Sequence, residues 1–289
     1  MEFERRCRHA ARLHLVDWIG QFRPLGGDLI HYLEAGAGEP LLLVHGFIAW
    51  SFTWRKNLPA LATQFRTLAP DLRGFGLSQR GTPGRYGLDD QADLLAAFLD
   101  ALQIDRAALV GHSMGGEIVL RFALRHPDRL KGMVLVAPSA LVRRRRHWLE
   151  RYLLGLPGLG PLAVRLAVLN RRFAARSLRE AHHRPDGVTA ADIAGYWLPA
   201  TLPGTARSFV AMLRQIDFGG AASRLGEIPH RALILWGEND PWVPVEHGRR
   251  LAELLPHSQL VTLPDCGHVP QEEYPELFHQ LVIPFLSSL

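Results

Sequence analysis

Short apolar runs alternate with longer amphipathic segments along most of this chain. The apolar runs are residues 41–44, 67–69, 107–110, 132–136, 232–236 and 259–263. Between them, segment 88–102 places its leucines and phenylalanine on one helical stripe. Strands that are apolar throughout and separated by helices are typical of a parallel sheet covered on both faces. Residues 29–33 alternate instead, which predicts an antiparallel strand at the start of the sheet.

This rhythm stops between Ser139 and Thr205, where no strand-like run occurs. Residues 162–178 have a helical pattern and follow the Gly- and Pro-rich breaker 155–161. We therefore expect residues 1–138 and 206–289 to form an α/β core and residues 139–205 to form a helical cap. Such an insertion would lie over the carboxyl ends of the strands, where open α/β sheets bind their ligands. Tyr196 and Trp197 are the expected pocket residues of the cap.

The most informative motif is the pentapeptide G-x-S-x-G at residues 111–115, which contains Ser113. It follows the apolar run 107–110 and precedes a helical segment, residues 116–126. A serine on a sharp strand-to-helix turn is held in a strained conformation with its hydroxyl exposed to a cleft. The pattern therefore predicts that Ser113 is a nucleophile, whereas the same residues elsewhere would form an ordinary glycine-rich turn.

A serine nucleophile needs a neighbouring imidazole to take its proton. The chain has 14 histidines, and His268 is the favoured base because it follows the apolar run 259–263 and precedes a predicted final helix, residues 273–286. His112 adjoins the serine, but neighbouring residues on a turn point apart, so it is a poor base for Ser113.

The base in turn needs a carboxylate that fixes its tautomer. Asp240 follows the apolar run 232–236, and the chain order Ser, Asp, His matches this architecture. Glu238 is the nearest rival. The preceding run ends at residues 136–139 without any carboxylate, which favours Asp240.

The negative oxygen formed during attack on a carbonyl needs hydrogen-bond donors. The run 41–44 leads into His45, Gly46 and Phe47, so the backbone N–H groups of Phe47 and Met114 are the expected pair. We expect the side chain of His45 to contribute to the substrate pocket.

Taken together, these motifs make the chain resemble the α/β-hydrolase-fold serine hydrolases, and among them a carboxylesterase with a helical cap. The matching residues are 45–47, 71–78, 111–116, 237–244 and 267–268. The segment 71–78 also resembles a turn of epoxide hydrolases and dehalogenases, whose nucleophile is an aspartate, whereas this chain has Ser113.

The resemblance implies acyl transfer, with a small-to-medium apolar carboxylic ester as the expected substrate. Hydrolysis of a carbon–carbon bond is an alternative, although relatives with that activity usually carry Asn before the serine and this chain has His112. Lactonase, amidase, thioesterase and perhydrolase activities remain open on the same fold. A receptor or scaffold role is disfavoured because no member of the expected triad is missing.

Composition narrows the remaining possibilities. The formal net charge is +5, and the run Arg143–Arg146 reads as a solvated face or as a docking patch for an anionic partner. No nucleic-acid module, nucleotide loop or metal-ligand spacing occurs, so we expect no cofactor, no metal and no nucleic acid.

Cys7 and Cys266 do not make a disulfide framework. The absence of a spanning segment and of a signal peptide favours a cytoplasmic enzyme, with the oligomeric state left open.

Overall fold

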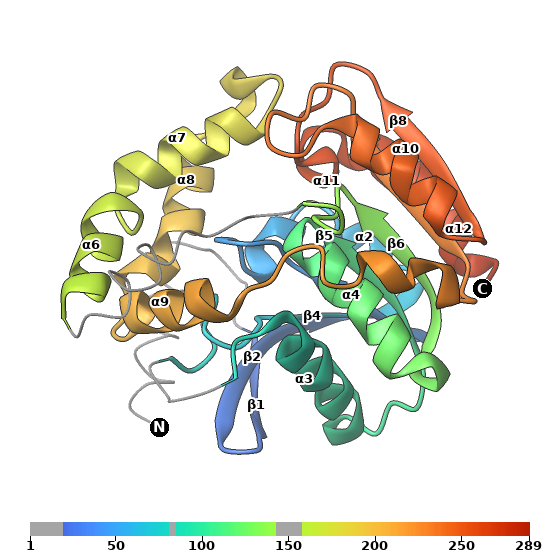
Figure 1. Cartoon of the computed structure of the whole chain (residues 1–289), viewed down its shortest axis with the longest axis horizontal. Coiled ribbons are helices and arrows are strands. Elements are labelled where there is room, and N and C mark those ends of the chain that lie inside the picture. The colour runs from blue at the N-terminus through green and yellow to red at the C-terminus, as the bar shows by residue number, and fades with distance from the viewer. Residues whose placement is uncertain (1–19, 81–84, 143–157) are drawn as a thin grey trace.

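The structure is a computed structural model that describes residues 20–80, 85–142 and 158–289. An eight-stranded sheet runs through it in the order β1-β2-β4-β3-β5-β6-β7-β8 (Figure 1). The strands are β1 Gln21–Leu25, β2 Asp28–Ala35, β3 Glu39–Val44, β4 Phe65–Pro70, β5 Ala107–His112, β6 Leu130–Val136, β7 Ala232–Gly237 and β8 Ser258–Leu263. The helices are α2 Leu58–Leu61, α3 Leu88–Ala101, α4 Met114–Arg125, α6 Leu159–Ala167, α7 Arg171–Ala181, α8 Ala190–Trp197, α9 Thr205–Gln215, α10 Val245–Leu254, α11 Pro270–Glu273 and α12 Pro275–Ser287.

The sheet is mostly parallel, as the apolar runs predict. β2 pairs antiparallel with β1 and β4, and the six strands from β4 to β8 pair in parallel. β1 has no counterpart in the sequence prediction. It is an edge strand, and its polar residues and Pro24 interrupt any apolar run. Such a sequence is tolerated because an edge strand is only partly buried.

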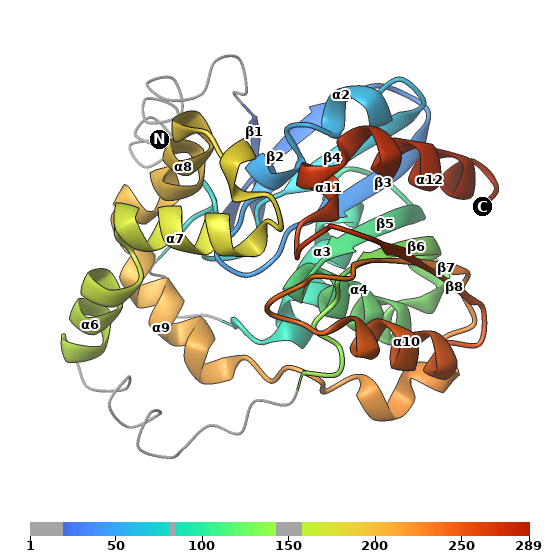
Figure 2. The ribbon, with the colours of Figure 1, turned by 90° about the horizontal axis from the view of Figure 1, so that it is seen from above.

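Helices lie on both faces of the sheet (Figure 2), and a large hydrophobic cluster fills the space on each face. Successive side chains of a strand point to opposite faces, so Leu42 of β3 packs with residues of α3, α4 and α10. Its neighbour Leu43 packs with residues of α2 and α12. This confirms an α/β architecture with helices on both faces, and it brings the carboxyl ends of the parallel strands to a single edge.

The described residues between β6 and β7 contain helices α6 to α9 and no strand, as the pattern between Ser139 and Thr205 predicts. The expected helix over 162–178 is divided into α6 and α7, because the side chain of Asn170 accepts a hydrogen bond from Phe173 N and starts a new helix. The predicted final helix is also divided, at Pro275. The run Arg143–Arg146 and Cys7 lie outside the described residues. Within the described ranges, no helix is both long and apolar enough to cross a bilayer.

Candidate active site

Ser113 lies on the turn between β5 and α4 in a strained backbone conformation, with φ 53° and ψ −116°. A side chain costs energy at such a positive φ, and such strain is typical of functional positions. The flanking glycines permit the turn. A Cβ on Gly111 would lie 2.5 Å from the carbonyl oxygen of Gly115, and one on Gly115 would lie 2.3 Å from the carbonyl oxygen of Val44. Only glycine fits at either place.

The start of α4 and the loop after β3 meet at Ser113. Met114 is the first residue of α4, so its N–H belongs to the helical turn whose donors have no partner within the helix. The loop after β3 approaches from the other side, since a Cβ on Gly46 would lie 3.2 Å from Ser113 Cβ. Phe47 follows Gly46 and lines the same cavity as Ser113. The hydroxyl itself pairs with Ser139 Oγ at 3.3 Å, and the sequence analysis gave Ser139 no role in the site.

The structure brings His268 and Asp240 together, from the loops after β8 and β7. His268 Nδ1 lies 2.6 Å from Asp240 Oδ2, and both side chains are buried. The other oxygen of Asp240 accepts from the backbone N–H groups of Trp242 and Val243 at 2.8 and 2.9 Å. A carboxylate held in this way accepts a hydrogen bond from Nδ1–H and leaves Nε2 of the ring free to act as a base. The side chain of Glu238 points elsewhere and accepts from Thr262 Oγ1 at 2.7 Å.

Two rings hold the imidazole of His268 in place. The ring centroids of His112 and Trp242 lie 4.9 and 5.0 Å from that of His268. Burial lowers the pKa of His112 to about 3, so this ring is neutral near pH 7. Its Nε2 lies 2.9 Å from the carbonyl oxygen of His268 and donates to it. His112 therefore positions the histidine loop and takes no proton from Ser113.

A cavity of about 450 Å³ opens over Ser113 and His268, with mainly apolar walls. Its described lining comprises Phe47, Ile48, Ala49, His112, Ser113, Ser139, Val142, Phe173, Ala174, Ser177, Leu178, Glu180, Ala181, Tyr196, Phe218, Trp242, Val243, His268 and Val269. Six of these residues come from α7, so that helix forms one wall. Glu180 is the acidic residue of this lining, and the described part contains no lysine or arginine. Most of these positions escaped sequence reasoning because they are ordinary apolar residues from distant segments.

Of the three expected pocket residues, one lines the cavity and two do not. Tyr196 lines the cavity, and its hydroxyl donates to the buried carboxylate of Glu272. Trp197, the next residue of α8, is not part of the lining. His45 is not part of it either, because burial and two hydrogen bonds keep it beneath the loop. Its Nδ1 donates to Gly46 O at 2.8 Å and its Nε2 accepts from Leu72 N at 3.0 Å.

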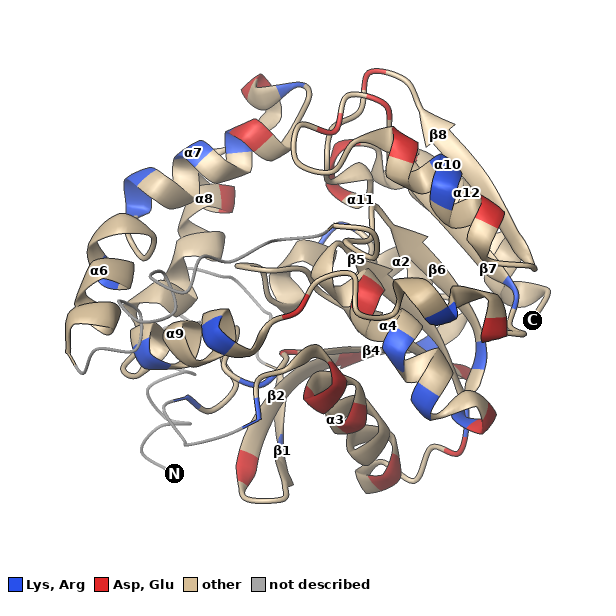
Figure 3. Ribbon diagram, viewed as in Figure 1, with Lys and Arg blue, Asp and Glu red and all other residues tan. Residues whose placement is uncertain are grey.

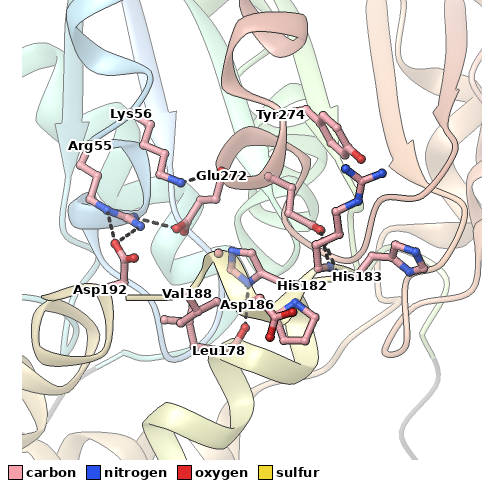
Figure 4. A pocket seen from close by; sticks show the side chains of 14 residues that line it. Arg55, Lys56, Leu178, His182, His183, Asp186, Val188, Asp192, Glu272 and Tyr274 are labelled. Carbon is pink, nitrogen blue, oxygen red and sulfur yellow. Dashed lines mark hydrogen bonds and ion pairs between the residues drawn. The ribbon is translucent and has the colours of Figure 1, made fainter. Parts of the chain in front are cut away.

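A second, polar cavity of about 550 Å³ lies between the α7–α8 region and α11 (Figure 4). Arg55 contacts Asp192 of α8 at 2.6 Å and Glu272 of α11 at 2.7 Å. Leu178 lines both cavities and separates the polar one from the apolar one. Arg55 thus pairs with both carboxylates and connects α8 to α11. Among the described residues, no group of histidine, cysteine and acidic side chains is arranged to hold a metal ion.

Comparison with known proteins gives the family. The profile of the α/β hydrolase fold family matches residues 39–275. A 2-hydroxy-6-oxo-2,4-heptadienoate hydrolase of Pseudomonas putida is 32% identical over 283 residues, which cover 93% of this chain and 97% of that enzyme. A meta-cleavage product hydrolase from Pseudomonas fluorescens IP01 shares 29% identity at a TM-score of 0.79, covering 93% of this chain and 98% of that one. A thermophilic esterase from Thermogutta terrifontis shares 28% identity at a TM-score of 0.75, with the same coverage of both chains. The chain belongs to the α/β hydrolase fold family and is a hydrolase.

Proposed function

We propose that the protein is a serine hydrolase that cleaves carboxylic esters of small-to-medium apolar groups through an acyl-enzyme intermediate. Ser113 is the nucleophile, His268 the general base and acid, and Asp240 the residue that orients the imidazole. The observation that carries the proposal is the strained Ser113 in one cavity with a His268–Asp240 pair at 2.6 Å. The helices α6 to α8, within residues 139–205, act as the cap over this site.

The reaction follows from these positions. His268 Nε2 takes the hydroxyl proton while Ser113 Oγ attacks the ester carbonyl carbon. The carbonyl oxygen becomes negative and is stabilised by the backbone N–H groups of Phe47 and Met114. The C–O bond to the alcohol then breaks, and the imidazolium returns its proton to the leaving alcohol. Water, deprotonated by His268, then attacks the acyl carbon, the bond from that carbon to Ser113 Oγ breaks, and the imidazolium returns the proton to Oγ as the acid leaves.

The pairing of the Ser113 hydroxyl with Ser139 does not oppose this sequence of steps. Catalytic hydrogen bonds are often long or misaligned in the absence of substrate and shorten in the reacting complex. Ser113 and Ser139 both line the cavity. Rotation about the Cα–Cβ bond of Ser113 would turn its hydroxyl away from Ser139, and His268 lines the same cavity.

The lining of the cavity supports an uncharged substrate. A dienoate, such as the one named for the Pseudomonas putida relative, carries a carboxylate, and a buried carboxylate needs a cation or several donors. The described lining contains Glu180 and no lysine or arginine. An apolar ester avoids this electrostatic cost and gains from contact with residues such as Phe173 and Val269.

Hydrolysis of a carbon–carbon bond is the second candidate. It is favoured by the Pseudomonas putida and Pseudomonas fluorescens relatives, which are similar along almost their whole length. The same serine, histidine and oxyanion donors serve that reaction, so the identity of the substrate separates the two functions. Hydrolysis of lactones or amides and formation of peracids would proceed through the same acyl-enzyme intermediate.

A direct test compares p-nitrophenyl esters of increasing acyl length with a 2-hydroxy-6-oxo-dienoate on the purified protein. We expect a higher kcat/KM for an ester, labelling of Ser113 by a fluorophosphonate, and loss of both in Ser113→Ala. That variant should lose turnover on the order of a million-fold, as in a comparable triad. Preference for the dienoate would replace the ester proposal with the second candidate, and full turnover in folded Ser113→Ala would exclude both.

A further inference from the structure

Helix α6 exposes a ridge of leucines that no described element covers. Leu159, Leu162 and Leu166 are 61%, 52% and 70% exposed, and they are half of the six large apolar residues with high exposure in the described chain. At 3.6 residues per turn, these three positions fall within about 60° of one side of the helix. The opposite side carries Val164, which is buried in the core cluster that includes residues of α9. Isolated exposed leucines are common, but three on one helix face indicate an interaction surface.

Arginines are frequent in α6 and in the segment that follows it. Residues 158–184 contain six arginines and one glutamate, an excess as large as the net charge of the whole chain. Arg165 is exposed on α6, and Arg171 and Arg172 are exposed at the start of α7 (Figure 3). The single glutamate, Glu180, pairs with Arg176 at 2.7 Å and so leaves the other arginines uncompensated by it.

We propose that the α6 ridge and these arginines form a docking surface for an anionic lipid membrane. An amphipathic helix with leucines on one face and arginines at its sides binds in the plane of a membrane interface, where the leucines enter the acyl boundary and the arginines attract anionic headgroups. The charge argues against a second copy of this chain as the occupant, because two arginine-rich surfaces repel each other.

The docking surface lies beside the helix that forms one wall of the apolar cavity. Helix α7 has its arginines on the outer side and Phe173, Ala174 and Leu178 on the wall of the apolar cavity. A membrane bound at α6 and at the start of α7 would therefore lie next to the helix that closes this cavity. Apolar molecules concentrate in membranes, so docking would bring the cavity close to their source. The binding itself requires no assumption about the reaction.

The test is partition of the full chain onto vesicles of phosphatidylcholine alone or mixed with phosphatidylglycerol, at low and high salt. We expect binding to the mixed vesicles, weak binding to neutral ones, and loss at high salt because screening weakens the attraction. The double variant Leu162→Gln/Leu166→Gln should bind about tenfold less or weaker still, since it removes apolar groups from the acyl boundary. Arg171→Gln/Arg172→Gln should bind at least tenfold less and respond less to salt.

Matched controls come from the far side of the molecule. Leu277→Gln changes an exposed leucine of α12, and Arg249→Gln/Arg250→Gln removes an adjacent arginine pair of α10. These variants should bind like the wild type, and all variants should keep wild-type turnover of a water-soluble substrate. Equal losses in both arginine pairs would show attraction by net charge alone and overturn the docking surface. Absence of binding to mixed vesicles would overturn it too, as would a dimer in sedimentation velocity that only the ridge variant loses.

Discussion

The backbone N–H of His268 donates to the carbonyl oxygen of Ala181 at 2.7 Å. Ala181 is the last residue of α7, so the loop that carries the proposed base is hydrogen-bonded directly to this helix. Glu273 strengthens this junction from α11. One of its carboxylate oxygens accepts from Gly267 N at 2.7 Å and the other from His183 N at 2.9 Å. Helix α7, residue His183 and the loop of His268 are therefore held together by one set of hydrogen bonds.

We expect Glu273→Gln to lower kcat more than it changes KM. A glutamine keeps one acceptor, but its amide nitrogen faces the N–H groups that the second carboxylate oxygen accepts from. Hydrogen bonds to a charged group contribute about 1.5–3 kcal/mol, so one side of the junction should open. Displacement of His268 by a fraction of an ångström would reduce kcat by roughly tenfold or more. Steady-state kinetics on an ester and amide hydrogen exchange of residues 178–186 measure the two effects.

Glu276→Gln is the control for this junction, because Glu276 is an exposed glutamate three residues further along. It should leave kcat and exchange unchanged. A Glu273→Gln enzyme with wild-type kcat and faster exchange would show that the junction fastens the cap without positioning His268.

This junction shows where sequence reasoning succeeded and where it ended. Ser113, Asp240 and His268 each follow an apolar run. Because the carboxyl ends of parallel strands meet at one edge of the sheet, their positions after these runs were enough to predict that the three residues lie at that edge. The fold followed from the same alternation. Glu273 carries no such signal, because a glutamate in a terminal helical segment is ordinary and its partner His183 lies 90 residues away in the chain.

His45 illustrates the opposite error. Its place after a strand and beside the oxyanion loop suggested a pocket residue, yet its hydrogen bonds to Gly46 and Leu72 turn the ring into the protein. A sequence shows which residues are near a site but not which way a side chain points. The direction depends on partners, such as Leu72 N, that come from another loop.

Asp240→Asn should reduce kcat by about four orders of magnitude. The asparagine amide can present its NH₂ group to His268 Nδ1, which favours the wrong imidazole tautomer while keeping the geometry. Glu238→Gln is the matched change two residues earlier, where the side chain contacts Thr262 at the surface. It should stay within a few-fold of the wild type. Equal losses in the two variants, with folding confirmed by circular dichroism, would contradict the role given to Asp240.

Glu117 should make stability depend on pH. Burial raises the pKa of this carboxyl group from 4.5 to about 7, although Oε1 accepts from Gly219 N at 2.8 Å and from Arg121 at 3.0 Å. A raised pKa in the folded state means that the protonated form is favoured there. Its contribution to stability is therefore complete below about pH 4.5 and is lost as the pH rises to about 7. The loss is at most about 3 kcal/mol.

Urea unfolding at several pH values checks this assignment. Glu117→Gln keeps a neutral side chain of the same shape, so its advantage over the wild type should grow as the pH rises from about 5 to about 7. Glu180→Gln, which changes an exposed glutamate of α7, should follow the wild-type curve. Parallel curves for Glu117→Gln and the wild type would show that the buried carboxyl is ionised throughout this range.

The last prediction separates the role of the cap from the chemistry of the core. Phe173 of α7 lines the cavity, whereas Trp197 of α8 does not. Phe173→Ala should remove an apolar contact that is equal in the bound substrate and in the transition state, and such contacts change KM more than kcat.

The space left by the Phe173 ring should favour longer acyl chains. We expect the ratio of kcat/KM for a long ester to that for a short one to rise by roughly tenfold, which is the scale of one or two methylene contacts. Trp197→Ala should leave this ratio unchanged even where it lowers stability. If instead Phe173→Ala lowers kcat equally for all esters, the cap wall is part of the catalytic geometry and the division between cap and core fails.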